Sequence, residues 1–195
     1  MKSRYIGLDE VEKLKKVAGD EIFLPFWISL ETGMRIGDVL KLKYTDLRAD
    51  GIHFTAEKTK KKGVAKITKN LRTELNYRGK GRPKRSYIFP SPKKLGAHLT
   101  RQSAWQRIKR AGEIAGVDID GLSPHTFRKV YAVELYRAKG FNAVKAALQH
   151  SHNAATEIYA FADWGTGKNA EEPLKRRDLE LIIKMVLEAL EHKKQ

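Results

Sequence analysis

The 195-residue sequence contains no cysteine. Without thiols, neither a disulfide framework nor a thiolate metal site can form. The six histidines also include no H-x-x-x-H pair with carboxylates nearby, the arrangement typical of a helical zinc site. The sequence therefore predicts chemistry that uses no bound metal ion.

Long apolar runs are absent too. None approaches the roughly 20 residues that cross a membrane, and the N-terminus, M-K-S-R-Y-I-G-L-D-E, lacks the apolar core of a signal peptide. We therefore expect an intracellular, cytoplasmic protein without a membrane partner.

Acidic residues are scarce: 23 Asp and Glu face 39 Lys and Arg, for a formal charge of +16. Such an excess favours a polyanionic partner, and nucleic acid ahead of an anionic membrane surface. A well-solvated surface would explain the basicity alone nearly as well, so the motifs have to decide.

Hydrophobic residues make up 41% of the chain, enough for the core of one domain spanning residues 1–195. Apolar spacing predicts an amphipathic helix that starts in a D-x-x-E capping box at Asp9 and ends at Gly19, followed by a buried helix that ends at Gly33. From residue 100 onward the pattern is helical. The expected helices there are 100–115, 124–139, 142–150, a short one around 159, and a C-terminal one within 174–195 after the loop 164–173.

Between these helical parts the sequence predicts a small sheet. Asp50 and Gly51 form a turn signal, and apolar residues then alternate with polar ones through residue 68, which indicates a β-hairpin with a lysine-rich tip. Residues 87–89 are expected to add a third short strand. The predicted fold class is α+β, mostly helical, with a small antiparallel sheet.

One segment, S-P-H-T-F-R at 123–128, is suited to binding an anion. Ser123 is a good N-cap and Pro124 a good first helical residue, which places His125 in the first turn and Arg128 on the same face. Free backbone N–H groups, the positive end of the helix dipole, an imidazole and a guanidinium would then face one phosphate.

Over nearly its whole length the sequence resembles the catalytic domain of a tyrosine recombinase of the phage integrase family. T-G-M-R-I-G-D at 32–38 is similar to the family's first arginine box, with the arginine at Arg35 and its acidic companion at Asp38. H-T-F-R matches the His-x-x-Arg box at His125 and Arg128. The resemblance implies that these four side chains belong to the active site, Asp38 in a supporting role.

The last box is L-Q-H-S-H-N-A-A-T-E-I-Y at 148–159, which resembles the family's nucleophile box with His150 nine residues before Tyr159. Gln149 departs from the family, which usually has glycine there. His152 is the alternative to His150, and the spacing to the tyrosine favours His150.

Lysines complete the predicted site. The hairpin tip E-K-T-K-K-K-G at 57–63 lies where the family keeps its catalytic lysine, and Lys58 is our choice. Its rivals, which are also candidate DNA contacts, are Lys60, Lys61 and Lys62. Further candidate DNA contacts in the basic loop 79–85 are Arg82, Lys84 and Arg85.

The residue types fit phosphoryl transfer. Attack on a phosphodiester builds charge on its non-bridging oxygens, and the guanidinium forks of Arg35 and Arg128 can neutralise that charge. Tyr159, with an ordinary pKa of about 10, would attack phosphorus with His125 accepting or orienting its proton. Lys58 would protonate the departing 5′ hydroxyl.

In the same scheme, His150 would hydrogen-bond the phosphate. The family resemblance implies a 3′-phosphotyrosine intermediate that stores the bond energy for rejoining, so that neither ATP nor any other cofactor is required. The implied partner is double-stranded DNA.

Simpler explanations exist for single residues. Arg35 could pair with Asp38 or Asp46 in a surface network. Tyr131 and Tyr136 fall in an apolar helical pattern and are expected in the core, where Tyr159 could also lie. The order and spacing of all the boxes together favour the catalytic interpretation.

Family members usually carry an additional N-terminal helical domain that closes around DNA. Here the boxes begin close to Met1, so we expect no such core-binding domain in this chain. The chain would then be either an excised catalytic domain or a natural short form, and a fragment is the simpler explanation. The apolar stripe within 174–195 suits self-association on DNA, or folding back on the chain's own core. The alternative functions are an inactive DNA-binding regulator on this fold and a type IB topoisomerase-like nicking-closing enzyme.

Overall fold

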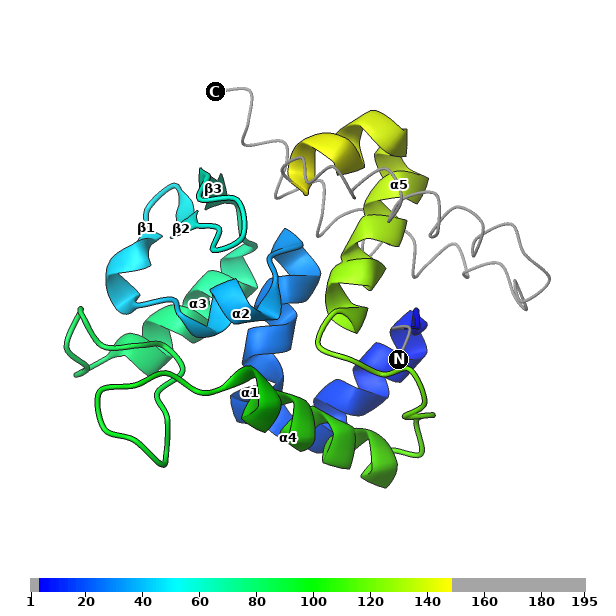
Figure 1. Ribbon diagram of the computed structural model, residues 1–195, viewed down its shortest axis with the longest axis horizontal. Coiled ribbons are helices and arrows are strands. Elements are labelled where there is room, and N and C mark those ends of the chain that lie inside the picture. The colour runs from blue at the N-terminus through cyan, green and yellow to red at the C-terminus, as the bar shows by residue number, and fades with distance from the viewer. Residues whose placement is uncertain (1–3, 149–195) are drawn as a thin grey trace.

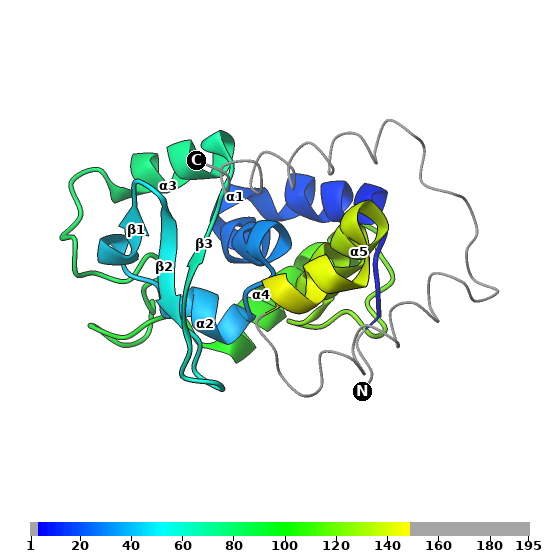
Figure 2. The same cartoon turned by 90° about the horizontal axis from the view of Figure 1, so that it is seen from above.

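The computed structural model describes residues 4–148, without the side chains of residues 140–142 and 145. Long helices lie on one side of the described part, and a small sheet with one further helix lies on the other (Figures 1 and 2). The helix α1 (Leu8–Thr32) packs against both α4 (Arg101–Ile114) and α5 (Thr126–Ala147). No helix in this part is long and apolar enough to cross a membrane.

The two helices expected before residue 33 form one element, α1, with a sharp bend. Gly19 has φ 66° and ψ 167°, a conformation that glycine adopts without steric cost, and the helix changes direction there. As a result Lys15 Nζ lies 4.2 Å from the centre of the Trp27 ring, whereas a straight helix would separate these residues by about 18 Å along its axis. The predicted end at Gly33 is confirmed, with φ 67°.

The first turn of α1 is capped differently from the prediction. Gly7 is the N-cap, and its N–H donates to Glu10 Oε2 over 3.0 Å, so the capping interaction lies two residues before the expected one. Asp9 instead lies inside the first turn, where its charge favours the helix dipole.

The sheet contains the predicted hairpin. Its strands run antiparallel in the order β1 (Leu47–Arg48), β2 (Gly51–Thr55) and β3 (Lys62–Ala65). The expected third strand at 87–89 is wrong. Tyr87 makes only an isolated bridge with Lys43, while Ile88 and Phe89 are buried in the core, and the third strand is β1.

One helix, α3 (Lys69–Gly79), was not expected. Its signals were present: Thr68 is a good N-cap and its hydroxyl accepts from Leu71 N over 3.3 Å, while Leu71 and Leu75, one turn apart, are fully buried. The buried carboxylate of Glu31 holds this end of α3 on α1, because it accepts hydrogen bonds from Thr68 N (2.9 Å) and Thr68 Oγ1 (2.8 Å). Burial raises the pKa of Glu31.

The helix expected at 100–115 is confirmed as α4, and Thr100 is its N-cap. The two helices expected at 124–139 and 142–150 are wrong as separate elements: the described part of that segment is the single helix α5, which bends toward its yellow end in Figure 1. Phe127, in the first turn of α5, packs against Phe23 and Phe26 of α1, with ring centroids 5.7 and 4.8 Å away. This contact fixes the start of α5 beside the end of α1.

Candidate active site

Two of the predicted boxes meet at the carbonyl oxygen of Gly33. The Arg128 guanidinium donates one hydrogen bond to that oxygen through Nη1 and another to Leu148 O, 3.5 Å from Nη2. Gly33 ends α1, and Arg35 follows as the N-cap of α2 (Ile36–Leu40). The fold therefore joins the segments that carry the two predicted arginines, although they are far apart in the sequence.

Arg35 is a partly buried cation. Its guanidinium makes no hydrogen bond or ion pair with any residue of the described part. The surface network considered above is not observed there, because Asp38 accepts from Glu57 N and Asp46 accepts from Lys43 N. As far as residues 4–148 show, the donors of Arg35 are therefore available to an anion.

The carboxylate of Asp38 anchors the lysine-bearing hairpin. Asp38 is buried, and its Oδ1 accepts from the backbone N–H of Glu57 over 3.0 Å. Lys41, at the end of α2, reaches the Glu57 carboxylate over 2.5 Å, and this bond holds the pKa of Glu57 below its usual range. Lys58, the next residue, is exposed on a base that α2 holds in place.

The tip itself has a defined turn. Lys60 N donates to Ala56 O over 2.7 Å, and Ala56 N donates to Lys61 O over 2.9 Å. Lys60 has φ 55°, the left-handed region that a turn of this kind requires. All the lysines of the tip are exposed, namely Lys58, Lys60, Lys61 and Lys62.

His125 is exposed at the start of α5, but the helix begins two residues later than expected, so His125 is the N-cap residue in place of Ser123. The helix begins at Thr126 because Ser123, Pro124 and His125 form a turn, in which Thr126 N donates to Ser123 O over 3.0 Å. Ser123 N donates to Thr126 Oγ1 (2.9 Å), and His125 N donates to Ser123 Oγ (3.2 Å). His125 is thus the N-cap residue, one turn before Arg128.

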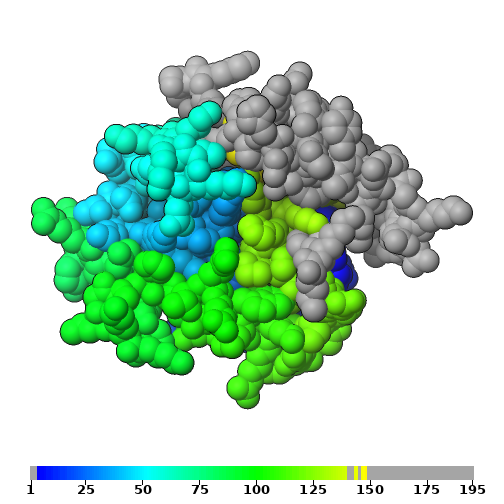
Figure 3. All heavy atoms as spheres, viewed as in Figure 1, coloured from blue at the N-terminus to red at the C-terminus, as the bar shows by residue number. Residues whose placement is uncertain are grey.

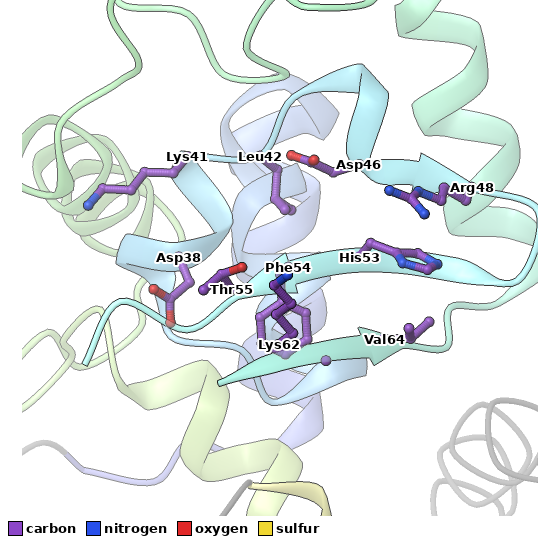
Figure 4. A pocket seen from close by; sticks show the side chains of 11 residues that line it. Asp38, Lys41, Leu42, Asp46, Arg48, His53, Phe54, Thr55, Lys62 and Val64 are labelled. Carbon is purple, nitrogen blue, oxygen red and sulfur yellow. The ribbon is translucent and has the colours of Figure 1, made fainter. Parts of the chain in front are cut away.

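A cleft lies beside the hairpin anchor, and no sequence pattern indicated it (Figure 4). Leu47 and Ile52 form the last residue pair between β1 and β2. Beyond this pair β2 continues while the chain before β1 turns away, and the cleft opens between them. Its charged and polar lining residues are Asp38, Lys41, Asp46, Arg48, His53, Thr55 and Lys62. Because the cleft depends on how two strands diverge, only the folded chain shows it.

The basic loop predicted from the sequence is held against the chain before the sheet. Thr45 N donates to Lys84 O over 2.9 Å, and Tyr44 N donates to Ser86 O over 3.2 Å. Its exposed cations are Arg82, Lys84 and Arg85. Figure 3 shows one face of the molecule on which the cyan hairpin, the lime surface of α5 and the green loops with α4 border a patch of blue surface.

The last box lies outside the described residues, so the structure does not place Gln149, His150, His152 or Tyr159. The same holds for the expected C-terminal helix. Within residues 4–148, no group of three or more His, Asp or Glu side chains is arranged to hold a metal ion.

Comparison with known proteins gives a consistent answer. Residues 8–164 match the Phage integrase family. Tyrosine recombinase XerD of Vibrio cholerae serotype O1 is 40% identical over 73 residues, which cover 37% of this chain and 24% of the relative. Tyrosine recombinase XerD of Yersinia pestis is 30% identical over 137 residues, 66% of this chain and 45% of the relative. The chain thus spans less than half the length of these relatives.

Solved structures share the fold. The XerH site-specific recombinase in its post-cleavage complex with a palindromic difH substrate aligns with a TM-score of 0.67 at 20% identity, over 88% of this chain and 52% of that one. A lambda integrase dimer bound to a COC′ core site aligns with a TM-score of 0.63 at 15% identity, over 90% and 63% of the two chains. XerA recombinase aligns with a TM-score of 0.65 at 19% identity, over 94% of this chain and 65% of that one. These matches confirm the predicted α+β class with its small antiparallel sheet.

Proposed function

Because this chain belongs to the phage integrase family, we propose that it is a site-specific DNA recombinase, or integrase, that cleaves and rejoins DNA strands. One structural observation carries the proposal. The Gly33 carbonyl joins the Arg35 and Arg128 segments, and Arg35 has no counter-ion in the described part. A partly buried guanidinium without a counter-ion favours binding of a phosphate.

In the proposed reaction the two arginines bind the scissile phosphate. Each can present paired N–H donors to a non-bridging oxygen, and the bond from Arg128 to Gly33 O supports a fixed separation of the two segments before DNA arrives. Donors of this kind stabilise the charge that develops as phosphorus is attacked, so they contribute to rate more than to affinity.

Lys58 is the proposed general acid. It would donate a proton to the 5′ oxygen as the P–O bond breaks, and the Asp38 anchor keeps the base of its hairpin in place. His125 would accept or orient the proton of the nucleophile from its exposed position at the start of α5.

Tyr159 is the proposed nucleophile and His150 a phosphate ligand, on the strength of the last box in the sequence. Attack by the phenol oxygen would leave a 3′-phosphotyrosine link and release a 5′ hydroxyl. The number of phosphodiester-type bonds is unchanged, so rejoining needs no ATP, and in this scheme the cationic side chains supply the charge that a metal ion would otherwise provide.

Double-stranded DNA is the proposed partner. Three structural relatives are a recombinase bound to difH, a lambda integrase dimer bound to a core site and a lambda integrase tetramer bound to a Holliday junction. By analogy we propose that this protein also self-associates on DNA. Exposed cations proposed to contact its backbone are Lys60, Lys61, Lys62, Arg82, Lys84 and Arg85.

The direct test is covalent capture. We expect the protein, in EDTA and without ATP, to form an adduct that resists denaturation with members of a pool of nicked duplexes whose central sequence is randomised. The nick lets the 5′-hydroxyl fragment diffuse away, which prevents rejoining and traps the intermediate. Sequencing the captured strands would identify the site.

The alternatives correspond to other outcomes of that experiment. DNA binding with no adduct from the whole pool would contradict the proposal and favour an inactive regulator. Adducts without sequence preference, together with relaxation of a supercoiled plasmid, would instead indicate a topoisomerase-like nicking-closing activity.

The anchor at Asp38 makes a separate prediction. In Asp38→Ala the Glu57 N–H loses its acceptor and Lys58 its fixed base, so the single-turnover cleavage rate should fall about tenfold or more. Asp38→Asn keeps an acceptor oxygen and should retain most of the rate. A substrate with sulfur as the bridging 5′ leaving atom needs no protonation, so it should restore cleavage by Asp38→Ala.

Asp46→Ala is the matched control, since that carboxylate lines the same cleft but accepts from Lys43 N instead. An Asp38→Ala protein that cleaves the ordinary substrate at the wild-type rate would show that the anchor does not position the general acid.

A further inference from the structure

The ring of Tyr131 fills the space directly above Gly33. Tyr131 is 7% exposed, and it lies in α5 one turn after Arg128. A Cβ added to Gly33 would lie 2.5 Å from two carbons of this ring and 3.1 Å from Leu148 Cδ2. Such distances leave no room for a side chain, so the ring and Leu148 rest on the glycine backbone itself.

Two of these residues, Gly33 and Leu148, also bind the Arg128 guanidinium. Arg128 donates to the carbonyl oxygens of Gly33 and Leu148, and Tyr131 packs against both residues. Tyr131 and Leu148 also belong to one buried apolar cluster. The orientation of the Gly33 carbonyl, and with it the position of Arg128 relative to Arg35, therefore depends on what fills this space.

We propose that Tyr131 is a positioning residue for the strand-cleavage site: its ring presses on Gly33 and Leu148 and thereby sets the spacing of Arg128 and Arg35. This inference rests on the proposed function of the two arginines. Tyr131 touches no reacting atom in this scheme, and its contribution is the volume and shape of its ring.

The hydroxyl of Tyr131 does not contribute to this positioning role. It makes no hydrogen bond with any residue of the described part. Burial raises the pKa of the phenol to about 12, against the opposing effect of the Arg128 charge, so the group stays neutral at working pH. A phenylalanine ring should therefore replace tyrosine, whereas a smaller apolar side chain should not.

The test compares Tyr131→Leu, Tyr131→Phe and Tyr136→Leu. Tyr136 lies on the same helix but is 38% exposed, which makes it the matched control. We expect Tyr131→Leu to cleave about 10- to 100-fold more slowly in single turnover with a DNA dissociation constant within about threefold of wild type, because a small displacement of a catalytic group affects rate far more than binding. Tyr131→Phe and Tyr136→Leu should stay within about threefold in both quantities.

A second measurement requires no DNA. Hydrogen exchange of the peptide containing Gly33 and Arg35 should be faster in Tyr131→Leu than in wild type, and unchanged in Tyr131→Phe and Tyr136→Leu. All variants are compared at a temperature where circular dichroism shows them folded.

The outcomes separate this inference from the proposed function. If wild type forms no adduct but the exchange pattern is as expected, the packing role of Tyr131 stands and the cleavage function falls. If wild type cleaves DNA and Tyr131→Leu neither slows cleavage nor speeds exchange, the positioning role is wrong. A loss in Tyr131→Phe equal to that in Tyr131→Leu would also overturn it, because the hydroxyl would then be the active group.

Discussion

The variant Tyr159→Phe is expected to form no covalent adduct with DNA while binding it with a dissociation constant within about twofold of wild type. The substitution removes the phenolic oxygen, which is the atom that attacks phosphorus in the proposed mechanism, and phenylalanine offers no nucleophile in its place. The measurement is denaturing electrophoresis of a labelled nicked duplex, paired with a filter-binding titration of the same DNA.

The matched control for this substitution is Tyr77→Phe, since Tyr77 is 67% exposed on α3. It should give adduct in wild-type amounts. Persistence of adduct in Tyr159→Phe would assign the nucleophile to another residue and remove Tyr159 from the proposed mechanism.

The second large effect is expected for Arg128→Lys, with a loss of about 100- to 1,000-fold in the single-turnover cleavage rate. Lysine keeps the positive charge but has no planar fork, so it cannot donate to the Gly33 carbonyl and also present paired donors to a phosphate. DNA affinity should change by less than about threefold, because the charge is retained. Rapid-quench kinetics with saturating protein measure the rate directly.

Arg137→Lys serves as the control on the same helix, because Arg137 pairs with Glu134 over 2.9 Å and touches neither Gly33 nor Leu148. It should cleave at the wild-type rate. A near wild-type rate for Arg128→Lys would mean that only the charge of Arg128 matters, and the geometric account of its contact with Gly33 would then be wrong.

Local sequence patterns predicted the structural elements that depend only on residues close together in the chain. The lysine-tipped hairpin and the end of α1 at Gly33 follow from strand alternation and from the glycine at the helix terminus, and both are confirmed. The bend at Gly19 was not predicted as part of one helix, because a glycine there is equally compatible with a helix end. α3 was missed because its N-cap and its two buried leucines are surrounded by polar residues.

Contacts between segments that are distant in the chain could not be predicted from the sequence. The boxes predicted which residues belong together, but the hydrogen bonds from Glu57 N to Asp38 and from Arg128 to Gly33 O depend on tertiary packing. Helical periodicity placed Tyr131 and Tyr136 together in the core. The prediction is confirmed for Tyr131. It is wrong for Tyr136, which turns toward solvent and is 38% exposed. The positions of His150 and Tyr159 stay predictions.

The closed base of the hairpin also limits how Lys58 can move. The Asp38 bond to Glu57 N fixes one side of the tip, and the pairing of Thr55 with Lys62 fixes the other. Loops this short rearrange within about a microsecond, whereas typical enzymes turn over about 1 to 1,000 times per second. Lys58 would therefore sample its positions many times in each catalytic cycle. Its contribution would depend on the equilibrium fraction of time spent beside the leaving oxygen, and the speed of the hairpin would not limit the reaction.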